Sequence, residues 1–402
     1  MADCEMVKKI CLIAPGLLPV PATGGGAIET LMTSLAKENE EFDSAEMTVI
    51  SPYEGKAHLD SSGYKNTRFI YISKTGILGK ALNKVSCAVH RLMDNTGNYG
   101  MSAFYNKALK RLKKLDATEH FDAVVFEGGP CDALTPYSRQ FGNRLMYHLH
   151  YNPDQSFRST GYSRIIAVSE FVAQSWRKNC LDPLSDVVVV HNGINLSRFQ
   201  KDVSAAERRE IRSRLGFDED DFVLLYCGRI IEVKGVLELL KAVRRIDDGH
   251  VKLMIVGSPD FAKSSRTPYL DKVQHLVDDL GNRVVFTGYV PNEDVYRYSK
   301  SADLQVVPSL WEDAAPTVCM EGMAAGLPLL VTRSGGIQEY TTTECAITVE
   351  KDENVIGRLA REISRLSKNQ AMLFAMSKAA LLRSDQFTEK FFYHAFVDAV
   401  SE

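Results

Sequence analysis

Short apolar runs alternate with amphipathic helical patterns along most of the chain. The runs are apolar at consecutive positions, which is typical of strands covered by helices on both faces of a sheet. Strands that alternate with helices in this way predict an α/β fold with parallel sheets. The runs predict strands in two series, Ile10–Ala14, Met47–Ile50, Ala123–Phe126, Leu145–Leu149, Ile165–Val168 and Val187–Val190, then Phe222–Tyr226, Val251–Val256, Val284–Phe286, Leu304–Val307 and Leu329–Val331.

A charged stretch without strand signals, Gln200–Asp221, separates the two series. We therefore expect a domain boundary near residues 195–205, with one Rossmann-like domain at 1–199 and a second at 200–386. Ligands of open parallel sheets bind beyond the carboxyl ends of the strands. Two such domains are expected to face each other across a ligand-binding cleft.

Composition narrows the classes of protein that the chain can belong to. Its 402 residues are 45% hydrophobic and 25% charged, as in ordinary globular proteins. The net charge of -3 argues against a nucleic-acid-binding protein, which usually carries a strong basic excess. No apolar run is long enough to span a membrane. The eight cysteines lack metal-ligand spacing and are expected to be reduced thiols in a cytoplasmic protein.

Glycines follow the first predicted strand of each domain. Gly24–Ala27 precedes a predicted helix at Ile28–Lys37, where the backbone can approach an anionic ligand closely. The spacing is not the GxGxxG pattern of dinucleotide sites, so NAD binding is not supported. A flexible surface loop is an equally good interpretation of these glycines.

The second domain repeats the arrangement with two cations. Arg229 and Lys234 follow the strand Phe222–Tyr226 and flank its turn into a helix. A guanidinium fork and an ammonium group in one loop can bind a diphosphate. The competing interpretation is a solvated charged loop.

The most informative stretch is Pro308–Pro328, which follows the strand Leu304–Val307. Pro316 is predicted as the first residue of a helix, because its missing N–H costs nothing there. The backbone amides of Thr317 and Val318 would then form an anion site at the helix start. Asp313 and Glu321 stand before and inside this helix, where they could bind sugar and ribose hydroxyls. The alternatives are a helix cap for Asp313 and an exposed helical charge for Glu321.

This stretch resembles the E-x7-E signature of glycosyltransferase family 4. Asp313 stands at the first glutamate and Glu321 at the second, and Met323–Pro328 matches almost completely. Glu312, beside Asp313, leaves a second register open. Further segments similar to the family occur in the same order, at Gly24–Ala27, Tyr147–His150, Ile166–Ser169, His191–Asn195, Gly228–Gly235, Phe286–Val290 and Gly335–Glu339.

The resemblance implies a retaining GT-B glycosyltransferase that uses a nucleotide diphosphate sugar, which we expect to be a UDP-sugar. It implies a first domain that binds the acceptor and a second that binds the donor. It implies an enzyme that needs no metal and no other cofactor. The implied roles are catalytic for His150, Asp313 and Glu321, diphosphate-binding for Gly25, Gly26, Arg229, Lys234, Thr317 and Val318, and nucleoside-binding for Tyr289, Val290 and Glu321.

Two departures from the family pattern bear on the donor sugar. Asp313 is one methylene shorter than glutamate, and Pro316 lacks the backbone donor that the family glycine has. These departures motivate one alternative, a non-catalytic scaffold subunit. A second enzyme alternative is a GT-B sugar-nucleotide epimerase, which would interconvert sugars without an acceptor.

Two amphipathic helices are predicted outside the strand series. Residues 104–115 combine Leu109 and Leu112 with five basic residues, which favours contact with an anionic membrane and a lipid-linked or other glycan acceptor. The protein would then work in the cytoplasm at the inner membrane face, although a merely solvated helix explains the charges equally well. Residues 387–402 carry phenylalanines at helical spacing, and the resemblance implies that this helix packs back on the first domain.

Overall fold

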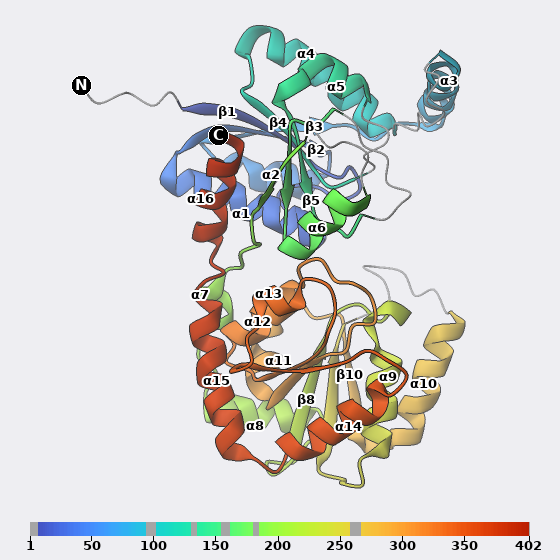
Figure 1. Ribbon diagram of the computed structural model, residues 1–402, viewed down its shortest axis with the longest axis vertical. Coiled ribbons are helices and arrows are strands. Elements are labelled where there is room, and N and C mark those ends of the chain that lie inside the picture. The colour runs from blue at the N-terminus through green and yellow to red at the C-terminus, as the bar shows by residue number, and fades with distance from the viewer. Residues whose placement is uncertain are drawn as a thin grey trace, which may run out of the picture. The chain divides into compact units, whose positions relative to one another are not determined.

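The protein forms two compact units, each built on one parallel sheet (Figure 1). The computed structural model describes residues 7–93, 102–129, 135–153, 161–179, 185–257 and 267–401. Unit 1 comprises Met1–Gly193 and Glu389–Glu402, and unit 2 comprises Ile194–Thr388. The predicted α/β fold with two parallel sheets is therefore confirmed.

The sheet of unit 1 has seven strands in the order β3-β2-β1-β4-β5-β6-β7. Its central strands are the most buried, and every residue of β4 is buried. The edge strand β3 was not predicted, although Phe69–Ile72 is an apolar run; three of these four residues are only half-buried, as is usual at a sheet edge. The strands are β1 (Lys8–Ile13), β2 (Ala45–Pro52), β3 (Thr67–Ile72), β4 (Ala123–Glu127), β5 (Leu145–Leu149), β6 (Arg164–Ala167) and β7 (Asp186–Val189).

Two helices were predicted in the first domain, and unit 1 contains both. The helix expected at Ile28–Lys37 runs from Ala27 to Phe42, and the basic helix expected at 104–115 is α4. Among the described helices none is both long and apolar enough to cross a bilayer. The helices are α1 (Ala27–Phe42), α2 (Gly55–Asp60), α3 (Ile77–Met93), α4 (Ala103–Glu119), α5 (Thr135–Phe141), α6 (Glu170–Asn179) and α16 (Glu389–Ser401).

The sheet of unit 2 has six strands in the order β10-β9-β8-β11-β12-β13. Alternate residues of its central strand β8 belong to different apolar clusters, Leu224 to one and Val223 and Leu225 to another. This burial on both faces explains why the strand is apolar at every position. The strands are β8 (Phe222–Cys227), β9 (Val251–Val256), β10 (Val284–Gly288), β11 (Leu304–Val307), β12 (Leu329–Thr332) and β13 (Ala346–Val349), the last of which was not predicted.

Helices connect these strands and end in a long C-terminal pair. They are α7 (Leu196–Phe199), α8 (Ala205–Arg214), α9 (Val236–Arg245), α10 (Pro268–Leu280), α11 (Val295–Ser301), α12 (Thr317–Ala324), α13 (Ile337–Tyr340), α14 (Val355–Leu366) and α15 (Gln370–Ser384).

The division between the units falls earlier than the expected boundary at residues 199 and 200. Ile194 and Phe199 pack in an apolar cluster of unit 2 with Met320 and Tyr340. The Ile194 amide also donates a 2.9 Å hydrogen bond to the Phe387 carbonyl. Residues 194–199 therefore belong to unit 2, because their side chains find their apolar neighbours there.

The chain returns to unit 1 through α16, which packs on α1 (Figure 1). Phe392 and Phe396 join the cluster that contains β1 and α1. The Tyr393 hydroxyl donates a 2.6 Å hydrogen bond to the Asn39 side chain, and the Ser34 hydroxyl donates to Glu389 at 2.5 Å. These contacts join the last helix to the first one across nearly the whole sequence.

We predict that Phe396→Ala lowers the free energy of unfolding by about 3–5 kcal/mol, because Phe396 is fully buried in unit 1. Phe391 lies on the same helix and is 61% exposed, so Phe391→Ala is the matched control and should change stability by less than about 0.5 kcal/mol. Urea unfolding followed by circular dichroism measures both. Equal effects of the two changes would contradict the packing of α16.

Candidate functional site

In unit 2 the loops after neighbouring strands meet backbone to backbone. Gly235 has φ +71°, and a Cβ atom there would lie 1.9 Å from the Pro308 carbonyl oxygen. Gly257, after β9, has φ +150° and stands equally close to the Gly228 carbonyl. Only glycine fits at such approaches. These contacts bring the loops after β8, β9 and β11 together at the carboxyl edge of the sheet.

The structure brings Lys234 and Asp313 into one ion pair at this edge. The Lys234 ammonium lies 2.5 Å from Asp313 Oδ1, and the Ser309 hydroxyl donates to Asp313 Oδ2 at 2.5 Å. Asp313 is nearly buried, whereas the lysine side chain is 28% exposed. The carboxylate is thus held by two donors, and the ammonium remains accessible from solvent.

Glu312, the other candidate for the first acid of the motif, points away from Lys234. Its carboxylate accepts a 2.6 Å hydrogen bond from the Gly335 amide and pairs with Lys351. A Cβ on Gly335 would lie 2.1 Å from the Asp313 carbonyl, and the Gly336 amide donates to that carbonyl at 2.7 Å. The glycine pair therefore supports the loop from behind, and Asp313 rather than Glu312 faces Lys234.

Helix α12 begins one residue later than predicted. Pro316 is its N-cap, in an extended conformation, because φ -74° and ψ 106° are not helical. Thr317 and Val318 are therefore the first helical residues, whose amides have no carbonyl one turn earlier to bind. Asp313 makes no cap hydrogen bond, so the interpretation of Asp313 as a helix cap is wrong.

Glu321 is half-buried rather than an exposed helical charge. Burial raises the pKa of its carboxyl, and the positive charge of Arg198 opposes this effect. Arg198, whose buried Nε has no hydrogen-bond partner in the described structure, was not predicted as a site residue. Arg198 could not be recognised from the sequence, because α7 is a single turn whose position beside α12 depends on the fold.

Arg229 is exposed in the loop after β8 and makes no ion pair with a described residue. Its carbonyl accepts a 2.7 Å hydrogen bond from the buried Tyr226 hydroxyl, which fixes the backbone of the loop. The guanidinium is therefore available to an anion near Lys234.

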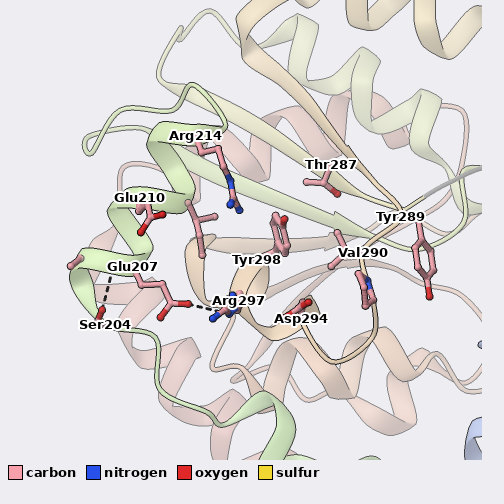
Figure 2. Close-up of a pocket in the computed structure, with 13 residues that line it drawn as sticks. Ser204, Glu207, Glu210, Arg214, Thr287, Tyr289, Val290, Asp294, Arg297 and Tyr298 are labelled. Atoms are coloured by element: carbon pink, nitrogen blue, oxygen red, sulfur yellow. Dashed lines mark hydrogen bonds and ion pairs between the residues drawn. The ribbon is translucent and has the colours of Figure 1, made fainter.

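Tyr289 and Val290 follow β10 and line a pocket of about 680 Å³ (Figure 2). The pocket is also lined by α8 and α11, and the ion pair of Arg297 with Glu207 at 3.1 Å stands at one side. Tyr289 is 66% exposed and lies at the far end from α8 in Figure 2. Of the predicted nucleoside residues, these two meet in the pocket, whereas Glu321 is not among its lining residues.

In unit 1 the glycine loop before α1 is set by the backbone itself. Gly25 and Gly26 have φ +81° and +96°, and a Cβ on Gly26 would lie 2.2 Å from a carboxylate oxygen of Glu29. Glu29 is buried at the first turn of α1, and burial raises its pKa. Both glycines are therefore required by the turn and by the buried carboxylate, whether or not a ligand approaches.

His150 belongs to a buried cluster with two residues that were not predicted. Glu127 ends β4 and stands beside His148 in the parallel register of β5, and His150 follows on the same face two residues later. Glu127 Oε2 lies 2.8 Å from His148 Nδ1 and 3.0 Å from His150 Nε2. The carboxylate thus holds both imidazoles through one oxygen, and each bound ring nitrogen carries the proton when Glu127 is ionised.

The electrostatics of this cluster favour a negative Glu127 and a neutral His150. Burial alone would raise the pKa of Glu127, but the charge and hydrogen bond of His148 and the hydrogen bond of His150 together lower it to about 2. Burial, reinforced by repulsion from His148, lowers the pKa of His150 to about 4.

The same three residues could hold a metal ion, since their ligand atoms lie within 4.8 Å of one another. Direct hydrogen bonds at 2.8 and 3.0 Å already satisfy the contacting atoms, and a metal would have to displace both ring protons.

The chain also contains one acidic D-x-D triplet, Asp218–Asp220, which the sequence prediction overlooked. It precedes β8 at the opposite edge of the sheet from Lys234, so it cannot hold a metal at that site.

Comparisons with known proteins agree with this geometry. Residues 207–383 match the family model described as glycosyl transferases group 1. A lipopolysaccharide 1,2-N-acetylglucosaminetransferase of Salmonella typhimurium is 25% identical over 355 residues, which cover 83% of each chain. An uncharacterised glycosyltransferase of Methanocaldococcus jannaschii is 33% identical over 184 residues, which cover only 45% of each chain.

Solved structures share the fold over the whole chain. Anabaena HepE, solved with UDP and glucose, superposes with a TM-score of 0.74 at 17% identity, covering 98% of this chain and 99% of that one. WaaG, a glycosyltransferase involved in lipopolysaccharide biosynthesis, gives 0.66 at 16% identity, covering 98% and 100%. The two parallel sheets therefore define a GT-B fold. Residues 207–383, within unit 2, match the group 1 glycosyltransferase model, in agreement with the resemblance of the E-x7-E-like stretch to family 4.

We predict that acid destabilises the protein in part through His150. Its pKa of about 4 in the folded protein lies below the 6.5 of an ordinary histidine, so the unfolded state binds the extra proton first. The contribution of His150 to the free energy of unfolding is fully present above pH 6.5 and is lost as the pH falls toward 4. Urea unfolding at pH 7.5 and 4.5 should show a smaller acid loss in His150→Gln than in the wild type. Exposed His275 gives the control variant His275→Gln, and an acid loss that is equal in all three proteins would refute the prediction.

Proposed function

We propose that the protein is a retaining glycosyltransferase that moves a sugar from a nucleotide diphosphate sugar, a UDP-sugar, to a glycan or lipid-linked acceptor. The observation that carries the proposal is the convergence of Arg229, Lys234, Asp313 and the start of α12 at one edge of the unit 2 sheet. Two cations and unpaired helix-start amides favour a diphosphate ligand there.

The diphosphate would accept hydrogen bonds from Arg229, Lys234 and the amides of Thr317 and Val318. When the sugar leaves, negative charge grows on the diphosphate, and fixed donors stabilise it without reorganisation. The Asp313 carboxylate holds the Lys234 ammonium in place at 2.5 Å and shares it with the incoming phosphate. In this proposal the protein's own cations do the work that a metal ion does in other glycosyltransferases.

Asp313 and Glu321 would bind hydroxyl groups of the donor. Both are acceptor groups when ionised, and sugars and ribose offer hydroxyl donors. Asp313 would take the transferred sugar and Glu321 the ribose, while Tyr289 and Val290 would border the base. The glycines Gly25 and Gly26 would let the backbone of unit 1 approach the donor.

His150 would orient the transferred sugar, and the contacts in unit 1 support a specific protonation state for that role. Glu127 accepts a 3.0 Å hydrogen bond from the Nε2–H group of His150, so Nδ1 carries the free lone pair. His150 is neutral above its low pKa of about 4 and can accept a sugar hydroxyl proton through that lone pair. Glu127 is thus a positioning residue in the proposal.

The named relatives support the donor and acceptor classes. One solved relative of the same fold is described in complex with UDP-glucose, and two relatives are named for lipopolysaccharide synthesis. We infer from these a role in polysaccharide or cell-surface glycan synthesis, at the cytoplasmic face of a membrane. The basic residues of the segment 104–115, within α4, would contribute attraction to anionic lipid headgroups.

A non-catalytic scaffold remains the second candidate, and the Lys234–Asp313 pair favours it. An aspartate that neutralises the lysine leaves Arg229 as the one cation of the proposed clamp without a salt bridge to a described residue. A scaffold of this kind would bind a nucleotide weakly and would turn over no sugar.

We predict that Arg229→Ala and Lys234→Ala each weaken UDP binding, by roughly 10- to 150-fold, because each removes a charge-assisted contact of about 1.5–3 kcal/mol. Isothermal titration calorimetry measures the affinities. Arg244→Ala removes an exposed arginine that pairs with Asp279 between two helices and serves as the control. Unchanged affinity in both clamp variants would remove the diphosphate assignment.

Transfer itself is tested with a panel of radiolabelled nucleotide sugars and membrane glycan extracts as acceptors. We expect turnover of at least one UDP-sugar, with the anomeric configuration of the sugar retained in the product. Added EDTA should leave the rate largely intact. Loss of activity that is restored by Mg²⁺ or Mn²⁺ would contradict the metal-independent mechanism, and hydrolysis or transfer of no sugar would favour the scaffold. Interconversion of sugars without an acceptor would favour an epimerase.

A further inference from the structure

Two opposite charges lie close together in unit 2 without closing into an ion pair. Arg198 belongs to α7 and Glu321 to α12, and these two helices pack on each other. The positive charge of Arg198 acts on the Glu321 carboxyl, yet the described structure has no salt bridge between the two groups. Charges that are taken out of water are normally paired and hydrogen-bonded, so the missing partners of this pair need an explanation.

Arg198 is held in place although its side chain lacks an acceptor. Its guanidinium carbon lies 4.6 Å from the centre of the Phe199 ring, and Phe199 is itself buried. Its backbone amide donates a 3.0 Å hydrogen bond to the Asn195 side chain, which caps α7. The buried Nε–H group finds no acceptor among the described residues. A buried donor without an acceptor costs free energy, so a ligand that supplies an acceptor is favoured here.

Glu321 lacks the matching donor. No hydrogen bond reaches its carboxylate from the part of the chain that the structure describes. The carboxylate lies near the Cys227 thiol at the carboxyl end of β8, because burial first and then the negative charge of Glu321 raise the pKa of that thiol. Cys227 and Val290 pack against the same apolar cluster. Glu321 thus stands beside a residue that would border the nucleoside.

The opposite charges of the pair decide which chemical group fits between them. A phosphate oxygen would be attracted by Arg198 but repelled by Glu321, and an ammonium group would meet the reverse. A hydroxyl group is neutral and offers both a donor and an acceptor. It can donate to the carboxylate and accept from the guanidinium at the same time. The ribose of a nucleotide presents two hydroxyl groups on neighbouring carbons.

We propose that Arg198 and Glu321 together hold one hydroxyl of the donor's ribose, which makes Arg198 a specificity-determining residue for the nucleotide. The inference rests on the proposed function, because it requires a nucleotide at this edge of the sheet. A nucleotide that lacks the hydroxyl would leave both charged groups unpaired, and unpaired buried groups reject such a ligand strongly. The protein should therefore select nucleotides with an intact ribose.

Calorimetric affinities for UDP, 2′-deoxy-UDP and 3′-deoxy-UDP test the proposal first on the unchanged protein. We expect the wild type to bind at least one of the two analogues roughly 30-fold more weakly than UDP. In Arg198→Gln the preference for UDP over that analogue should fall by about tenfold, because the hydroxyl loses its charged donor. Arg209→Gln changes an exposed arginine of α8 that pairs with Glu219, and it should keep the wild-type preference.

The outcomes separate this inference from the donor site itself. Wild-type protein that binds UDP no better than both analogues would overturn the inference and leave the diphosphate assignment standing, whereas no binding of UDP would overturn both. An Arg198 with a merely structural role would lower the affinities for UDP and the analogue by one factor, which also overturns the inference.

A measurement at higher pH covers the remaining structural role, in which Arg198 only keeps Glu321 ionised. In that case the preference of Arg198→Gln for UDP should return between pH 7.5 and 8.5, as Glu321 loses its proton again. A preference that returns would contradict the shared hydroxyl. A preference that stays low at both pH values supports it.

Discussion

The ion pair between Lys234 and Asp313 is the contact on which the candidate donor site depends. It joins the loop after β8 to the loop after β11, and it forms only because Gly235 allows the backbone to lie against Pro308. With Ser309 it fixes the carboxylate before any ligand arrives. A site built in this way is preorganised, since its donors and acceptors need little rearrangement to meet a diphosphate.

Unit 1 is organised around a different buried charge. Glu127 lies beneath the surface between two histidines, and its ionised form is stable there only because both imidazoles donate to it. The consequence is a defined tautomer for His150. The last helix, α16, closes this side of the unit, since Phe392 and Phe396 pack near the His148 ring. Stability and the proposed orientation of the sugar thus share one set of contacts.

The sequence predicted the fold class and most strands, because burial on both faces makes a parallel strand apolar at every position. It missed β3, a half-buried edge strand, and it placed the unit boundary late because the apolar partners of Ile194 lie far along the chain. The residues proposed for the site in unit 2 were singled out by their positions after predicted strands and by the resemblance to family 4. Glu127 was not, because its role depends on the register of two strands, and Arg198 was not, because its place beside α12 depends on the fold.

A structure of the protein with UDP bound tests the central claim most directly. The account predicts that oxygens of the diphosphate lie within hydrogen-bond distance of the Thr317 and Val318 amides and contact Arg229 and Lys234. A diphosphate found instead in the pocket of Figure 2, against Arg297 or the residues of α8, would contradict it.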